Sequence, residues 1–323
     1  MHADLAATAA ASVRAHARIR DHIRRTPLLP SLALGPRAGS GLLFKAEQFQ
    51  RTGSFKSRGA FSKLTSLAVD DTGLVTASSG NHGLATSDAA AVLGKRLTVH
   101  LPESVEPSKL AAIQARGVEI VLHPGDSGVA EQRARADAER RGLVYVSPYN
   151  DPEVVAGQGT IGLELLDERV PIDAVFVAMG GGGLIGGIGA VLKCFAPHIR
   201  IIGVAAANSA ALAAAMAVGR VIDVPHLPTL ADGVAGGMDE DAITLPLARA
   251  VIDEVVSCSE TEIAAALAAL AFDEGQLVEG AAALALAGWM QMAEHMQGKT
   301  SVVVLCGGNV DRRRLVDLLR SER

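Results

Sequence analysis

One lysine in the segment RTGSFKSRGAF, residues 51–61, stands where a side-chain amine could serve as a nucleophile. We expect Lys56 to lie in the first turn of a helix, where the positive helix end and the neighbouring Arg58 both disfavour its charge. An amine with a lowered pKa can attack a carbonyl carbon and form a Schiff base. Because a lysine near a helix start is more often a solvated surface residue, this segment predicts a nucleophile only together with other motifs.

A second segment, TASSGNHGLA at residues 76–85, combines small hydroxyl and amide side chains with the start of a helix. Ser78, Ser79, Asn81 and the backbone N–H groups that follow can bind a carboxylate, because unpaired N–H groups gather at a helix N-terminus. The Asn81 amide is available to a phenolate-like oxygen. The alternative is a plain helix cap, for which one such residue suffices.

Four consecutive glycines, Gly180–Gly183, stand in the segment AMGGGGLIGGIGA between an expected strand and an expected helix. Exposed N–H groups and the helix dipole make such a loop an anion site that suits phosphate. The Lys-Ser/Thr ending of a nucleotide P-loop is missing. The spacing Gly181-x-Gly183-x-x-Gly186 fits a dinucleotide fingerprint, but no acidic residue follows the next strand. A further alternative is that the glycines serve only close packing of helix and strand.

The last candidate is Cys306 in VVVLCGGN, residues 302–309. It falls at the carboxyl end of a buried strand, which is the ligand-bearing edge of a parallel sheet. A lone buried cysteine is more often a small apolar residue.

The elements that must position these residues alternate between short β-like runs and alanine-rich helical stretches. This alternation predicts βαβ units and largely parallel sheets. We expect an α/β protein of two domains, each a mostly parallel twisted sheet with helices on both faces. The larger comprises residues 1–68 and 148–323, and the smaller residues 69–147.

Composition narrows the possible partners of the chain. Its 323 residues are 49% hydrophobic and 20% charged with a net charge of −5, and no basic stripe with interleaved aromatic residues is present, so we expect no nucleic-acid partner. Two uncharged runs, 174–192 and 201–219, are too interrupted for membrane spans. Cys194, Cys258 and Cys306 show neither disulfide nor metal spacing, and the N-terminus does not resemble a signal peptide. We therefore expect a cytoplasmic protein with no membrane partner.

Taken together and in this order, the motifs SFKSRGA, SSGNHG, GGGGLIGG and LCGGN resemble those of the fold type II pyridoxal-phosphate enzymes. Within that group, which has the fold of the tryptophan synthase β subunit, the chain is similar to the serine/threonine dehydratase and serine racemase family. The segments VVAGQGTIGLEL, residues 154–165, and VEGAAALALA, residues 278–287, are also typical of it. The resemblance covers nearly the whole chain and implies pyridoxal 5'-phosphate as cofactor.

The resemblance also implies roles for individual residues. Lys56 carries the Schiff base and later acts as a base, and Ser79 is a second catalytic candidate on the opposite side of the substrate. The cofactor-binding residues are Phe55 on the ring face, Asn81 at the 3-oxygen, Gly180, Gly181, Gly182, Gly183 and Leu184 at the phosphate, and Cys306 at the ring nitrogen. The substrate-binding residues are Ser78, Ser79, Asn81, His82 and Tyr149.

A thiol opposite the ring nitrogen favours β-elimination, since it does not keep that nitrogen protonated as a carboxylate would. We therefore expect a dehydratase, or ammonia-lyase, that converts a β-hydroxy amino acid resembling L-threonine or L-serine into a 2-oxo acid and ammonia. Because Ser79 is typical of racemases, a serine or other amino-acid racemase stays open, as does a lyase for hydroxyaspartate. A non-catalytic dinucleotide-binding protein is the distant alternative.

Two further expectations come from the same resemblance. The segment in which several family members bind a divalent cation has no carboxylate here, with Ala207, Asn208, Ala211 and Ala213 in its place, so we expect no metal. We expect the protein to assemble as a homodimer.

Overall fold

The computed structural model describes residues 4–68, 72–310 and 316. Its larger sheet has six strands in the order β1-β2-β10-β7-β8-β9, and all neighbours are parallel except the antiparallel pair of β1 and β2. The strands are β1 (Leu28–Pro30), β2 (Gly41–Ala46), β7 (Ala174–Ala178), β8 (Arg200–Ala206), β9 (Glu254–Cys258) and β10 (Thr300–Leu305).

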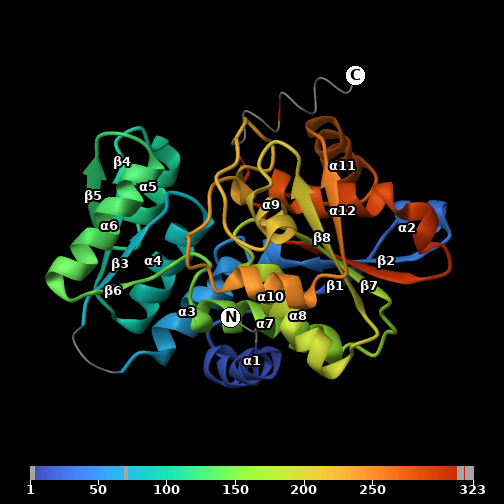
Figure 1. Cartoon of the computed structure of the whole chain (residues 1–323), viewed down its shortest axis with the longest axis horizontal. Coiled ribbons are helices and arrows are strands. Elements are labelled where there is room, and N and C mark those ends of the chain that lie inside the picture. The colour runs from blue at the N-terminus through green and yellow to red at the C-terminus, as the bar shows by residue number, and fades with distance from the viewer. Residues whose placement is uncertain (1–3, 69–71, 311–315, 317–323) are drawn as a thin grey trace.

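The smaller sheet has four parallel strands in the order β5-β4-β3-β6. They are β3 (Leu74–Ala77), β4 (Leu97–Pro102), β5 (Glu119–His123) and β6 (Val144–Tyr145). All four lie between residues 69 and 147, and the strands of the larger sheet lie outside that segment. Figure 1 shows the smaller sheet with its helices on the left and the larger sheet on the right. The predicted α/β class with mostly parallel sheets is confirmed.

Helices cover both faces of the larger sheet (Figure 1). On one face, α12 packs against β7, β8, β9 and β10, and α11 packs against α12. On the other face lies α8, which contacts α7, α1 and α10. The helices of this part are α1 (Leu5–Ile19), α2 (Leu34–Ala38), α3 (Lys56–Ser66), α7 (Pro152–Asp167), α8 (Gly183–Phe195), α9 (Ala211–Val218), α10 (Thr244–Val251), α11 (Glu260–Phe272) and α12 (Gly280–Gln291), with 3-10 turns η1 (Glu47–Phe49), η2 (Asp232–Val234) and η3 (Ala293–Met296).

The smaller sheet is flanked by α4 (Asn81–Leu93), α5 (Pro107–Gln114) and α6 (Ser127–Arg141). Its apolar core also takes in Ile19 from α1 and Phe61 and Leu64 from α3. Helix α3, which begins at the candidate nucleophile Lys56, also packs against α7 of the larger part. Helix α3 therefore contributes to the core of the smaller sheet and also packs on a helix of the larger part, and the domain boundary at residue 68 stays a prediction.

The long uncharged run 174–192 comprises β7, the glycine loop and α8, and it is apolar because both elements are buried. The second half of its glycine motif serves helix packing. A Cβ atom on Gly187 would lie 2.4 Å from the Val155 carbonyl oxygen of α7, and one on Gly189 would lie 2.5 Å from Val251 of α10. Among the described residues, no helix is long and apolar enough to cross a membrane.

Candidate active site

Lys56 is the first residue of α3 and lies directly beside the end of β10. The Phe55 N–H donates to the Cys306 carbonyl over 3.0 Å, and Ser54 forms a β-bridge with Gly307. The Lys56 amine donates to the Pro148 carbonyl at 2.8 Å, and it lies 5.1 Å from the centre of the Phe55 ring. The end of β10 thus holds the backbone next to Lys56, and the Pro148 carbonyl holds its amine.

Burial lowers the pKa of the Lys56 amine to about 8, against the weaker opposing effects of Cys306 and Glu279. The lowered pKa agrees with the sequence prediction, but its cause differs. The guanidinium of Arg58 turns away into a separate ion cluster, where it is neutralised by Glu47 and Glu164. Desolvation, not repulsion by Arg58, therefore makes this amine easier to deprotonate.

Glu279 is a residue of this site that the sequence did not reveal. Its carboxylate accepts two hydrogen bonds from the Asn81 amide nitrogen, at 2.9 and 3.0 Å, and the residue is only 7% exposed. Burial raises the pKa of Glu279 to about 7. In the sequence, the feature that could have indicated Glu279 is a single carboxylate near the start of the apolar segment 278–287.

The Asn81 amide is oriented from both sides. While its nitrogen donates to Glu279, its oxygen accepts from the Asn309 amide at 2.7 Å, and that same Asn309 nitrogen donates to the Thr52 carbonyl. Asn309 belongs to the LCGGN motif, so the asparagine of one predicted motif directly positions that of another. The Asn81 amide is thereby held at the carboxyl edges of both sheets.

The Cys306 thiol is buried at the end of β10, near Lys56 and Glu279. Burial raises the pKa of this thiol well above its ordinary value, and the nearby carboxylate of Glu279 adds to the effect. The thiol is therefore neutral, as expected of a group that does not keep the ring nitrogen of the cofactor protonated.

The glycine loop connects β7 to α8 and leaves the first turn of α8 without capping side chains. Gly182 is the N-cap with φ +88°, a conformation that favours glycine, and it has no side chain to cap the first N–H groups of the helix. Among the described residues, no acceptor is found for the N–H groups of Gly183, Leu184 and Ile185. These donors, at the positive end of a helix, suit a phosphate group.

Close packing also requires glycine in this loop. A Cβ atom on Gly181 would lie 2.5 Å from the ring of Tyr149, and one on Gly180 would lie 3.2 Å from the backbone of Val234. The Thr244 hydroxyl donates to the Gly181 carbonyl at 2.6 Å. Both interpretations left open by the sequence, anion binding and close packing, are therefore compatible with this loop.

Tyr149 links the loop to the nucleophile. Its ring packs on Gly181, its hydroxyl accepts the Asp239 N–H at 2.7 Å, and the preceding Pro148 carbonyl accepts from Lys56. The structure thus joins Lys56 to the glycine loop through residues 148 and 149, which follow the smaller sheet.

The other predicted substrate residues surround the start of α4. The Ser78 hydroxyl accepts the Gly80 N–H at 3.2 Å, whereas no hydrogen bond of the half-buried Ser79 side chain is found within the described part of the chain. Neither serine caps α4, whose N-cap is Gly80. The His82 ring is buried beneath them, 3.0 Å from both the Thr76 hydroxyl and the Val146 carbonyl, and burial lowers its pKa to about 3. His82 is thus neutral and directed at the sheet.

This donor set fits pyridoxal 5'-phosphate. It offers an amine of lowered pKa, a neutral thiol, an oriented amide and three unpaired N–H groups at a helix start. Among the described residues, no group of three or more histidine, cysteine, aspartate or glutamate side chains could hold a metal ion.

Comparison with known proteins agrees with the geometry. Residues 19–307 match the family model described as pyridoxal-phosphate dependent enzyme, and the chain belongs to this family. The chain is 41% identical to an L-threonine ammonia-lyase of Geobacter sulfurreducens over 298 aligned residues. The alignment covers 91% of this chain and 73% of that protein.

Two solved structures show the same fold at full length. A processed threonine deaminase isoform 2 from Solanum lycopersicum has a TM-score of 0.93 and 30% identity, with 99% of this chain and 94% of that chain covered. A serine racemase from maize has a TM-score of 0.89 and 29% identity, with 100% and 98% covered. The predicted fold type II pyridoxal-phosphate enzyme, its cofactor and its lyase class are thereby confirmed. The predicted roles of individual residues stay predictions.

Proposed function

We propose that the protein is an ammonia-lyase that acts on L-threonine, and less efficiently on L-serine. The reaction removes a proton from Cα and a hydroxyl from Cβ, and hydrolysis of the resulting enamine returns the water and releases a 2-oxo acid and ammonia. The observation that carries the proposal is the Lys56 amine, whose pKa is lowered to about 8 beside Glu279 and Cys306. The name of the Geobacter relative supports the choice of substrate.

In this proposal the cofactor, when bound, withdraws electrons from Cα. Lys56 would hold it covalently, the N–H groups of Gly183, Leu184 and Ile185 would hold its phosphate, Asn81 its 3-oxygen, Cys306 its ring nitrogen, and Phe55 would pack on its ring face. A neutral Lys56 amine can accept the Cα proton near neutral pH, because its pKa is close to that range. The Ser78–Asn81 loop, at the start of α4, would bind the substrate carboxylate.

The test is a panel of L- and D-threonine, L- and D-serine and L-hydroxyaspartate, assayed for 2-oxo acid release by the holoenzyme. We expect the highest kcat/KM for L-threonine. A holoenzyme that binds the cofactor, as judged by its visible absorbance, and yet releases no 2-oxo acid from any of the five would contradict the proposal.

Racemisation is the second candidate, favoured by the Ser79 hydroxyl, which has no hydrogen bond within the described part of the chain, and by the likeness to maize serine racemase. Chiral chromatography of L-serine reactions separates the two activities, since a lyase forms pyruvate faster than D-serine. Ser79→Ala is compared with Ser78→Ala, which removes a neighbouring hydroxyl that already has a partner. A racemase would lose D-serine formation selectively in the Ser79 variant.

We also propose a cytoplasmic homodimer that binds an amino-acid substrate and neither nucleic acid nor membrane. The three free cysteines support a reducing compartment. The family resemblance supports the dimer, and light scattering on the purified holoenzyme tests it, with twice the chain mass as the expected result.

A further inference from the structure

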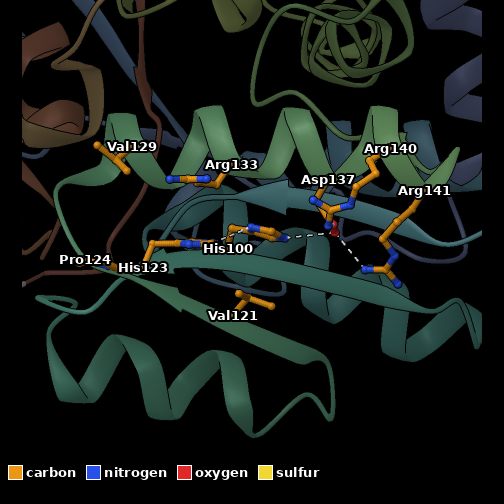
Figure 2. Close-up of a pocket in the computed structure, with 9 residues that line it drawn as sticks. All are labelled: His100, Val121, His123, Pro124, Val129, Arg133, Asp137, Arg140 and Arg141. Carbon is orange, nitrogen blue, oxygen red and sulfur yellow. Dashed lines mark hydrogen bonds and ion pairs between the residues drawn. The ribbon is translucent and has the colours of Figure 1, made fainter.

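A pocket of about 350 Å³ lies away from the candidate active site, between strands β4 and β5 of the smaller sheet and one face of helix α6 (Figure 2). Its volume lies within the range of small-molecule sites. The lining is rich in side chains that carry or can carry a charge, namely His100, His123, Arg133, Asp137, Arg140 and Arg141.

Two histidines form the floor of this pocket. His100 Nδ1 and His123 Nε2 are 2.8 Å apart, and the two rings are stacked with centres 5.0 Å apart. His100 is only 4% exposed, and its other nitrogen, Nε2, has no hydrogen-bond partner among the described residues. The nearest carboxylate oxygen, on Asp137, is 3.6 Å away. Figure 2 shows this nitrogen directed at Asp137, at an ion-pair distance that is too long for a hydrogen bond. A buried ring nitrogen without a hydrogen bond is costly, and an oxygen atom of a ligand could accept one from it.

Helix α6 supplies the positive charge. Arg133, Asp137, Arg140 and Arg141 recur at helical spacing and so share one face of α6. Arg140 and Arg141 both pair with Asp137, over 2.9 Å in the case of Arg141, and retain further N–H donors. Arg133 has no ion-pair partner among the described residues. Three guanidinium groups therefore face the pocket against a single carboxylate.

We propose that this pocket binds a phosphate group, either as inorganic phosphate or as the ester of a small metabolite. Guanidinium groups bind phosphate oxygens in pairs of parallel hydrogen bonds, and a histidine pair can add a donor. Val121 and Val129 give the pocket an apolar wall against which the organic part of an ester can pack. The site is distinct from the glycine loop, which belongs to the larger sheet and is the proposed site of the cofactor phosphate.

The test is calorimetric titration of the holoenzyme, in which the active-site phosphate cradle is already filled, at constant chloride concentration. The probes are inorganic phosphate, ribose 5-phosphate and ribose. We expect saturable binding of phosphate or ribose 5-phosphate without loss of the cofactor's visible absorbance, and no binding of ribose. Tighter binding of the ester than of phosphate would identify a phosphorylated metabolite as the ligand, and equal binding would identify free phosphate.

Arg133→Ala is the deciding variant, because this exposed side chain forms no ion pair with any residue that the structure describes. Removal of one guanidinium–phosphate contact should weaken binding by about 10-fold. The matched control is Arg37→Ala, which removes an exposed arginine on α2 that pairs with Asp273 and should leave the dissociation constant unchanged. The absence of saturable binding in the unaltered holoenzyme, or equal affinities in Arg133→Ala and Arg37→Ala, would overturn the proposal.

Discussion

Lys56 and Arg58 are two residues apart on helix α3, yet their side chains enter two buried charge clusters of opposite character. Arg58, Lys45, Glu47 and Glu164 form a structural cluster, in which every charge has a partner. Lys56, Glu279, Cys306 and Asn81 form the active-site cluster, in which Lys56 is hydrogen-bonded to a carbonyl and Glu279 to an amide.

The structural cluster compensates burial with charge. Arg58 is fully buried and donates to Glu47 over 2.8 Å and to Glu164 over 2.6 Å, and Lys45 donates to Glu164 at 2.5 Å. Despite the burial, these pairings raise the pKa of Arg58 and lower that of Glu164. Arg58 and Glu164 are thereby held in their ionised forms, which suits a cluster that anchors α3 to its neighbours.

Burial in the active-site cluster is left largely uncompensated. The pKa of Lys56 falls to about 8 and that of Glu279 rises to about 7, so both groups are close to exchanging protons near neutral pH. Buried charges that are paired with opposite charges hold a helix in place, whereas buried ionisable groups without such a partner are available for chemistry. The same helix turn provides both, and this places a reactive amine on a rigid support.

The largest effect is expected from Lys56→Ala, which removes the amine of the active-site cluster and leaves the structural cluster intact. Release of 2-oxo acid from L-threonine should fall on the order of 10³-fold or more, because both proposed roles of Lys56, covalent anchor of the cofactor and proton acceptor, are lost. Steady-state kinetics measure the loss, and thermal unfolding of the cofactor-free proteins should show a nearly unchanged midpoint, since the variant differs there only by one side chain. A variant with wild-type turnover would show that this amine takes no part in the reaction.

Arg58→Met tests the structural cluster. It leaves the Glu47 and Glu164 carboxylates buried without their main partner, so the free energy of unfolding should fall by about 3–5 kcal/mol. Urea denaturation measures the change. As a control, Arg25→Met removes a surface arginine that pairs with Asp167 and Glu168 and should cost less than about 1 kcal/mol. Equal losses in the two variants would refute the distinction drawn between buried and exposed pairs.

The sequence predicted the active-site cluster better than the structural one. Lys56, Asn81, Cys306 and the glycine loop stand in motifs whose local pattern indicates a role, and the structure places the first three around one site. The alternation of strands and helices likewise predicted both sheets, because hydrophobic periodicity is a local property.

What the sequence did not reveal depends on contacts between distant segments. Glu279 becomes a site residue through Asn81, which is 198 residues away in the chain. The closeness of Arg58 to Lys56 in sequence predicts repulsion between the two charges, but the Arg58 side chain is turned towards Glu164, 106 residues away. Likewise, the need for glycine at position 181 comes from the ring of Tyr149 and not from the loop itself.

One substitution, Glu to Gln, should have opposite effects on stability in the two clusters. In the cofactor-free protein the pKa of Glu279 is about 7, against 4.5 as its ordinary value. Between these pH values the unfolded carboxyl is ionised while the native one keeps its proton, so wild-type stability falls as the pH rises. Glu279→Gln removes this slope. At pH 8 the variant should be more stable than wild type by on the order of 2–3 kcal/mol, and near pH 4 the two should be similar.

Glu164→Gln provides the matched comparison in the structural cluster. The pKa of Glu164 is lowered by Arg58 and Lys45, so its ionised form stabilises the native state above the ordinary pKa, and this stabilisation is lost as the pH falls. At pH 8 the substitution should therefore destabilise the protein, by about 3 kcal/mol, because it leaves two buried cations with one carboxylate. Urea denaturation of both variants at pH 4 and pH 8 gives the two signs. If both variants lose stability at pH 8, the ionised form of Glu279 stabilises the native state as that of Glu164 does. The proposed difference between the two clusters would then be wrong.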